Sequence, residues 1–118
     1  MNDDSILNCV KGMLGIDKSC DVYDKDLVVH INGVFLTLYQ IGVGKYPSRI
    51  DNEFQEWSII FSDNLDLIDL IKDYTYMKVR IIFDPPSSSF VLDSLKKQMD
   101  EYEWRIQIQA EGGFEDGN

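Results

Sequence analysis

Two adjacent prolines, Pro85 and Pro86, interrupt the longest stretch of helical hydrophobic periodicity in this sequence. Apolar residues recur at helical spacing over residues 65–83 before this pair and over residues 90–110 after it. Proline has no backbone N–H and pushes the preceding residue out of the α region, so one continuous helix is excluded. Because only a Pro-Pro-Ser turn joins the two patterns, the sequence predicts two helices that fold back as an antiparallel hairpin.

The first helix of this hairpin, expected over residues 65–83, is apolar on two sides. One arc contains Leu67, Leu70, Ile71, Tyr74, Met77, Ile81 and Ile82, and a second contains Leu65, Ile68, Tyr76, Val79 and Phe83. A helix that is apolar on two sides is expected to pack against other parts of the protein on both of them, so this helix should be central.

The second helix, expected from Ser87–Ser89 to about Ala110, has one main apolar stripe and one smaller set. The stripe should pack on the preceding helix and consists of Val91, Leu95, Met99, Tyr102 and Ile106. The smaller set, Phe90, Trp104 and Ile108, lies on roughly the opposite side. A small monomer would expose that set, which favours a subunit or partner interface. The alternative is that both sides are buried in one compact monomer.

The N-terminal half predicts two further helices. The first is capped by Asp3, Asp4 or Ser5 and runs to Leu14, with Gly15 as the residue that ends it. The second covers residues 27–41 and ends at Gly42.

Residues 42–56 contain glycines, a proline and no helical period, so they are expected to form a loop with extended or hairpin character. Residues 57–61 should form a short helical turn or a buried strand-like run. The predicted fold is therefore mainly α: a small bundle of about four helices with a long C-terminal helical hairpin and one loop or short β-hairpin insertion. We expect one helical domain over residues 1–110 and a flexible, acidic tail over residues 111–118, which contains Phe114.

The charge of the chain limits its partners. Its 118 residues include 21 acidic and 11 basic side chains, which give a formal net charge of −10. A protein that grips nucleic acid by neutralising phosphates needs clustered Lys and Arg, so this function is disfavoured. DNA that passes nearby without being gripped is still compatible with the charge.

Export and membrane insertion are not expected. The apolar runs are far shorter than the ~20 residues that cross a bilayer, and no basic segment precedes an apolar one at the N-terminus. The two cysteines, Cys9 and Cys20, have no accompanying CxxC motif, which is typical of reduced intracellular thiols.

Catalytic and metal-binding patterns are weak. The single histidine, His30, lies in a predicted helix and is more typical of a structural residue than of a catalytic base. Asp66, Asp69 and Asp73 share a helix face, as do Asp100 and Glu103, but in so acidic a chain they are most simply solvated. No GxxxxGK[ST], GxGxxG or GxSxG motif occurs. We therefore predict a protein that is not an enzyme and needs no cofactor or metal.

Four segments resemble the small helical head-tail connector proteins, also called adaptor or head-completion proteins, of tailed bacteriophages that infect low-GC Gram-positive bacteria. They are LNCVKGMLGID (7–17), DLVVHINGVFLTLYQIGVG (26–44), LIKDYTYMKVRIIFDPP (70–86) and LKKQMDEYEWRI (95–106). The FDPPSSS turn and the EYEWR helix are the most distinctive parts. The resemblance covers nearly all of residues 7–106.

This resemblance implies a structural virion protein at the head-tail interface, made in the host cytoplasm. Such proteins form a ring, usually of twelve copies, that docks on the portal protein, extends the DNA channel and presents a surface to the next tail or stopper component. The portal or subunit interface would then include Phe90, Tyr102, Trp104, Ile108 and Phe114. Lys45, Tyr46 and Arg49 are candidates for contact with the channel or a neighbouring copy.

Two alternative functions stay open. One is a tail-completion or stopper protein of the same particle, although stoppers are typically β-rich. The other is a small acidic binding module that inhibits a nucleic-acid enzyme by mimicking DNA.

Overall fold

Within residues 4–111, which the computed structural model describes, the chain forms five α-helices and one 3-10 helix. They are α1 (Ile6–Met13), α2 (Asp24–Gln40), α3 (Trp57–Ile60), η1 (Ser62–Leu67), α4 (Ile68–Phe83) and α5 (Ser89–Ala110). Strand pairing in this part of the chain is limited to one isolated bridge between Ser5 and Glu56. The mainly helical prediction is confirmed, and residues 42–56 form a loop rather than a β-hairpin. The short run after this loop is the helical turn α3.

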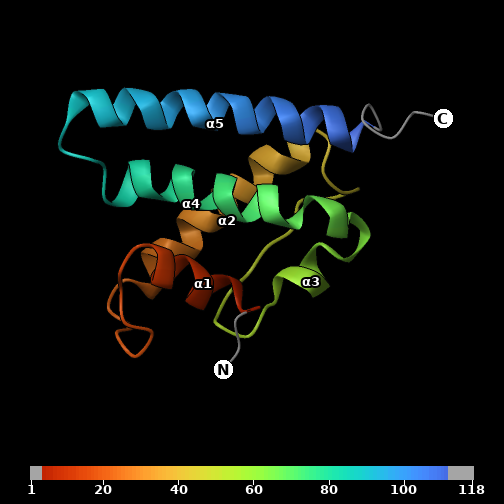
Figure 1. The fold of residues 1–118 in the computed structure, drawn as a ribbon. Coiled ribbons are helices and arrows are strands. Elements are labelled where there is room, and N and C mark those ends of the chain that lie inside the picture. The colour runs from red at the N-terminus through yellow and green to blue at the C-terminus, as the bar shows by residue number, and fades with distance from the viewer. Residues whose placement is uncertain (1–3, 112–118) are drawn as a thin grey trace.

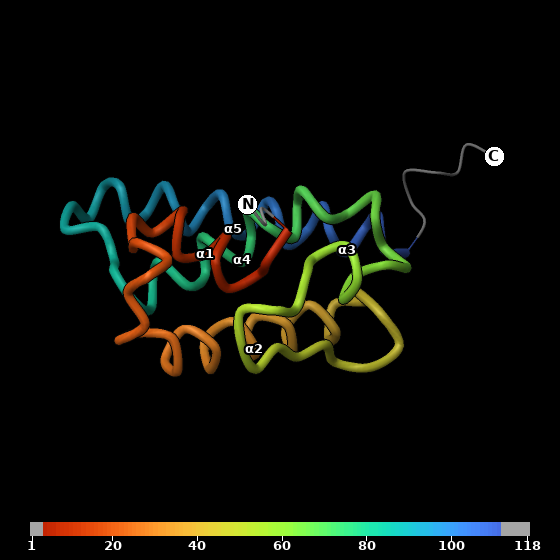
Figure 2. The backbone as a smooth tube through the Cα atoms, turned by 90° about the horizontal axis from the view of Figure 1, so that it is seen from below, coloured from red at the N-terminus to blue at the C-terminus, as the bar shows by residue number. Residues whose placement is uncertain are grey.

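The helices form two layers. Figure 1 shows α5, α4 and α1 side by side, with α5 at one edge, and α2 crossing behind them. Figure 2 shows α2 as a separate layer, below α1, α4 and α5 in this view, and the loop that follows α2 runs back beside that helix. The antiparallel α4–α5 hairpin predicted from the two prolines is present (Figure 1).

The core lies between these layers and is centred on α4. Residues on α2 and α4 that face each other are completely or almost completely buried, as are two aromatic side chains from the α3 turn, Trp57 and Phe61. The ring of Phe35 packs edge-on against Phe61 at 5.1 Å and against Trp57 at 6.1 Å between centroids. The central position predicted for α4 is correct, but two residues assigned to its apolar arcs, Leu65 and Ile82, are 60% and 55% exposed.

Two helices start three residues away from the predicted position. Helix α2 begins at Asp24, three residues earlier than expected, because Asp24 and Asp26 lie in its first turn, where carboxylates favour the positive end of the helix dipole. Helix α4 begins at Ile68 rather than Leu65. The preceding residues form η1, in which Asn64 has non-helical backbone angles (φ −135°, ψ 43°).

The start of α1 is held by residues 53–58. The hydroxyl of Ser5 accepts a hydrogen bond from the Asn8 amide, which confirms it as the cap, and donates one to the carbonyl of Glu53 at 2.7 Å. Trp57 N donates to the carbonyl of Asp4, and the Ser58 hydroxyl donates to the Asp4 carboxylate. The other cap candidate, Asp3, lies outside the described residues. As predicted, a glycine, Gly15, takes the left-handed conformation (φ +79°) after the helix.

Lys11 is a buried cation that the sequence pattern did not reveal. Its side chain is 1% exposed, and its ammonium lies 2.9 Å from the Asp24 carboxylate. The same ammonium donates to the carbonyl of Lys18 at 3.0 Å. Met13 and Leu14, at the end of the same helix, are half-buried. Lys11 therefore ties α1 to the first residue of α2 and to Lys18, within the connection that leads into α2.

Helix α5 is the least buried long helix. Among its residues only Ile106 is fully buried. Val91, predicted to pack on α4, is 47% exposed, because α5 is the edge helix and its first turns have no second neighbour (Figure 1). The buried Tyr74 hydroxyl of α4 donates to the Glu103 carboxylate at 2.7 Å, and burial together with this bond raises the pKa of Tyr74. Polar bonds thus supplement a modest apolar contact.

Candidate interaction surfaces

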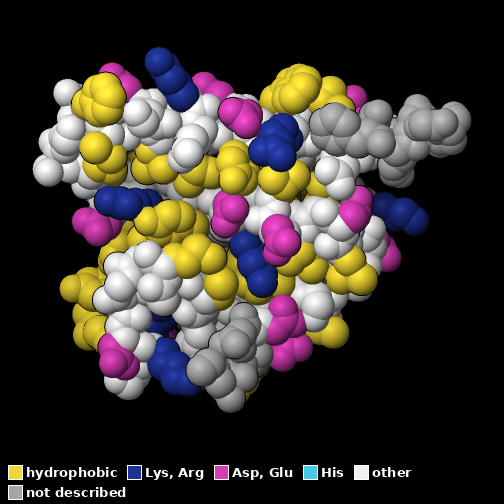
Figure 3. Space-filling view, viewed as in Figure 1, with side chains coloured by type: hydrophobic (Ala, Val, Ile, Leu, Met, Phe, Trp, Pro, Cys, Tyr) yellow, Lys and Arg dark blue, Asp and Glu magenta, His cyan; other side chains and the backbone are white. Residues whose placement is uncertain are grey.

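The outer edge of α5 carries exposed aromatic side chains. Phe90 is 78% exposed and Trp104 is 57% exposed, while Ile108 is half-buried. Figure 3 shows hydrophobic groups on this edge at both ends of the helix, with charged side chains between them. Since neither aromatic residue is needed to fill the core, the edge is available for a partner.

Tyr102 lies on the other side of α5. It packs against the hydrophobic core, and its hydroxyl donates to the Asp73 carboxylate on α4 at 3.4 Å. Burial, followed by the nearby Asp73 charge, raises the pKa of Tyr102. This residue joins α4 to α5, so it does not belong to the same exposed surface as Trp104. Phe114 and the rest of the predicted tail beyond residue 111 lie outside the described residues.

The three candidate residues of the 42–56 loop separate into two places. Asn32 on α2 uses both atoms of its side-chain amide to hold the backbone of Ile50: Nδ2 donates to the carbonyl at 2.9 Å, and Oδ1 accepts from the amide at 2.8 Å. This clamp fixes the loop along α2 and brings Arg49 to the outer face of that helix. Lys45 and Tyr46 lie elsewhere, facing the turn after α3.

The outer face of α2 and the clamped loop form a groove, which we call the α2 groove. Its wider part has a volume of about 560 Å³ and is lined by Val28, Val29, Asn32, Gly33, Leu36, Pro47, Ser48 and Arg49. A second part of about 400 Å³ shares Val28 and Val29 and continues toward Lys25 and Glu53. Val29 is 67% exposed and Leu36 is 46% exposed. Arg49 is predicted from the sequence as a contact residue, but the groove is not, because the loop course that creates it depends on a side-chain clamp.

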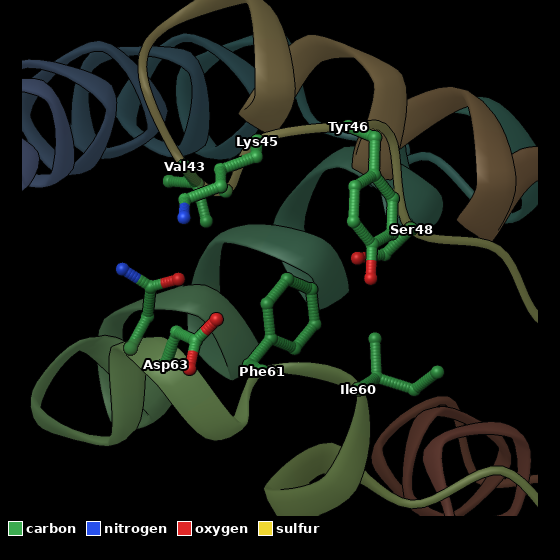
Figure 4. A pocket seen from close by; sticks show the side chains of 9 residues that line it. Val43, Lys45, Tyr46, Ser48, Ile60, Phe61 and Asp63 are labelled. Carbon is green, nitrogen blue, oxygen red and sulfur yellow. The ribbon is translucent and has the colours of Figure 1, made fainter.

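Lys45 and Tyr46 line a smaller pocket with Phe61 and Asp63 across it (Figure 4). Its volume is about 60 Å³, which suits water molecules rather than a larger ligand. Tyr46 is 73% exposed beside it. These two residues therefore form an exposed rim without a cavity that would bind a cofactor.

Further apolar side chains gather near the α4–α5 turn. Val22 is 76% exposed, and Tyr23 packs edge-on against Phe83 at 5.2 Å between ring centroids. No periodic apolar pattern predicts this patch, because residues 17–26 are mostly polar.

Asp66, Asp69 and Asp73 are exposed, as predicted, and two of them also accept a hydrogen bond from α5. Asp73 binds Tyr102, and Asp66, in the turn before α4, accepts from the Gln109 amide at 2.9 Å. Across residues 4–111, no group of three or more His, Cys, Asp or Glu side chains is arranged to hold a metal ion. In the same range, no helix is long and apolar enough to span a bilayer. His30 is half-buried on α2.

The phage connector protein family matches residues 6–113 of this chain. The chain belongs to that family. No curated protein and no solved structure shows significant similarity to this connector. The resemblance stated from the sequence is thus confirmed at the level of the family. Membership identifies the chain as a connector component of a phage particle and favours a structural over an enzymatic role.

Proposed function

We propose that this connector assembles as a ring between the capsid portal and the tail, and that the ring extends the DNA channel. The observation that carries the proposal is family membership over residues 6–113, combined with an edge helix whose aromatic residues Phe90 and Trp104 are left exposed. Side-to-side contacts between unlike faces close into rings when the rotation allows it. Twelve copies is the number that the family resemblance implies.

The charge supports passage of DNA without specific binding. A net charge of −10 per copy repels phosphate, so DNA would slide past an acidic wall, whereas a basic wall would hold it. In a mobility-shift titration at ~50 mM salt, where an electrostatic site binds most strongly, we expect no complex. Micromolar affinity with a steep salt dependence would contradict this part of the proposal.

We further propose that assembly depends on the portal. Bringing copies together increases like-charge repulsion, which contacts with the portal must offset. The connector should therefore be a monomer or small oligomer alone and a ring on portal assemblies. Light scattering across a salt series, with and without purified portal, tests this. A connector that stays monomeric and never joins the portal would refute the proposal.

Two alternatives have less support. A stopper or tail-completion role at the next position is disfavoured by the helical fold, since stoppers are typically β-rich. A DNA-mimic inhibitor would bind a basic enzyme from solution and would not join portal particles. Pull-down of portal but of no basic host enzyme would exclude it. In our proposal the protein is made in the bacterial cytoplasm and ends in the virion at the head-tail interface.

A further inference from the structure

The wider part of the α2 groove contains a cation and no carboxylate. Its lining is mostly apolar, with Asn32 and Ser48 as neutral polar residues, and the charged residue among those that line it is Arg49. Arg49 makes no ion pair within residues 4–111. In a chain with ten excess negative charges, this groove is suited to an apolar surface that also carries a carboxylate.

The outer edge of α5 has that composition. Trp104 is exposed there, and Asp100 lies one helical turn before it on the same side. Asp100 is exposed and has no ion-pair partner in the described part of the chain. Ile108 continues the apolar edge one turn further. An indole and a carboxylate therefore stand next to each other on a helix with a free side.

We propose that the α5 edge of one copy docks in the α2 groove of the neighbouring copy, with Trp104 in the groove and Asp100 facing Arg49. This inference rests on the ring assembly proposed above and names the surfaces that join its copies. The two surfaces share no residue, so the contact is head-to-tail, and each added copy uses one of its surfaces and leaves the other free for the next copy. Such a contact propagates around a ring.

The groove is built to receive a large side chain. A volume of about 560 Å³ lies within the range of small-ligand pockets. A Cβ added to Gly33, one of the residues that line it, would meet no atom within 4 Å, so an incoming indole can approach the backbone of α2. The wall formed by residues 47–49 is already fixed by the Asn32 clamp, so little ordering is needed on docking.

The first test fills the groove without touching α5. Gly33→Gln places a long polar side chain in the groove, whereas Gly33→Ala adds only a methyl group and is the matched control. We expect Gly33→Gln to raise the concentration for half-maximal ring formation on portal by about tenfold or more, as loss of a binding hot spot does. Gly33→Ala should assemble like the wild type. Normal assembly of a folded Gly33→Gln protein would overturn the inference.

The second test reads the contact directly. Cys9 and Cys20 are first replaced by serine, and the pair Leu36→Cys and Gln107→Cys is then introduced. Cross-linking of these two thiols in assembled rings should join neighbouring copies and give a ladder of multimers. The control pair, Leu36→Cys and Ser87→Cys, places the second thiol just before the start of α5, about 30 Å from position 107, and should give no ladder. A ladder from Leu36→Cys alone, or cross-links from it to portal, would overturn the inference.

The charge pair is tested by reversal. Arg49→Glu should weaken assembly, and the added change Asp100→Arg should restore most of it, because the attraction returns with opposite signs. Failure of the double variant to recover would overturn the assignment of this pair. If rings form on portal but the cross-linking, groove-filling and reversal results are all negative, this contact is refuted while the proposed ring assembly stands. A wild-type protein that never forms rings would refute the proposed function instead.

Discussion

The buried ion pair between Lys11 and Asp24 predicts an unequal response to removing its two members. The Lys11 side chain is 1% exposed, whereas that of Asp24 is 27% exposed. Asp24→Ala leaves a buried ammonium whose remaining partner is the Lys18 carbonyl, and breaking a buried pair in this way costs about 3–5 kcal/mol of unfolding free energy. Lys11→Met leaves the partly exposed Asp24 carboxylate, which water can reach, and the methionine fills the space of the lysine side chain. We therefore expect the unfolding free energy to fall by about 1–2 kcal/mol.

Urea unfolding of the isolated protein measures this difference. With a denaturant dependence of about 1–3 kcal/mol per molar urea, Asp24→Ala should lower the midpoint by roughly 1 M or more. Asp26→Ala is the matched control, because Asp26 lies in the same first turn of α2 and is exposed. Asp26→Ala should lower the unfolding free energy by only ~0.5 kcal/mol, the size of a helix-dipole effect. If Lys11→Met is as damaging as Asp24→Ala, the argument from unequal exposure is refuted.

Three further outcomes are expected. Because the pKa of Tyr74 is raised in the folded state, its contribution to stability is present below about pH 10 and is lost as the pH rises further, by at most about 1.4 kcal/mol per pH unit. In thermal or urea unfolding, Tyr74→Phe should reduce this loss of stability at alkaline pH. Trp104→Ala should leave the urea midpoint unchanged but weaken association by about 2–4 kcal/mol. Trp57 is fully buried, so Trp57→Ala should cost about 3–5 kcal/mol of folding stability. A larger loss of folding stability in Trp104→Ala than in Trp57→Ala would place Trp104 in the core. Gly33→Ala should stabilise the isolated protein by about 0.5–1 kcal/mol, because α2 gains a better helix former in open space, and a lower calorimetric midpoint would contradict this.

The helices could be predicted from the sequence because their signals are local. Apolar spacing, the Ser5 cap, Gly15 and the proline pair each act within a few residues, and each appears in the structure. The exposure of Phe90 and Trp104 could also be predicted, since it follows from their position opposite the stripe containing Ile106. The family resemblance came from the same segments.

The features that were missed depend on contacts between distant residues. Burial of Lys11 requires an acceptor on α2, and the α2 groove requires the Asn32 amide to hold Ile50, eighteen residues away. Neither leaves a periodic trace in the sequence, because each uses a single polar side chain at a position that would otherwise read as solvent-exposed.

The attachment of α1 to residues 53–58 has a consequence for the order of folding. Ser5 reaches Glu53 across 48 positions and Asp4 reaches Ser58 across 54, so the start of α1 must wait until a long chain segment has closed on it. The α4–α5 hairpin joins two helices across one tight turn, and its Tyr74–Glu103 bond spans 29 positions, so a shorter chain segment has to close. We therefore expect the C-terminal hairpin to acquire structure early and the N-terminal helix to complete the fold late. Substitutions around Ser5 should then speed unfolding more than they slow refolding.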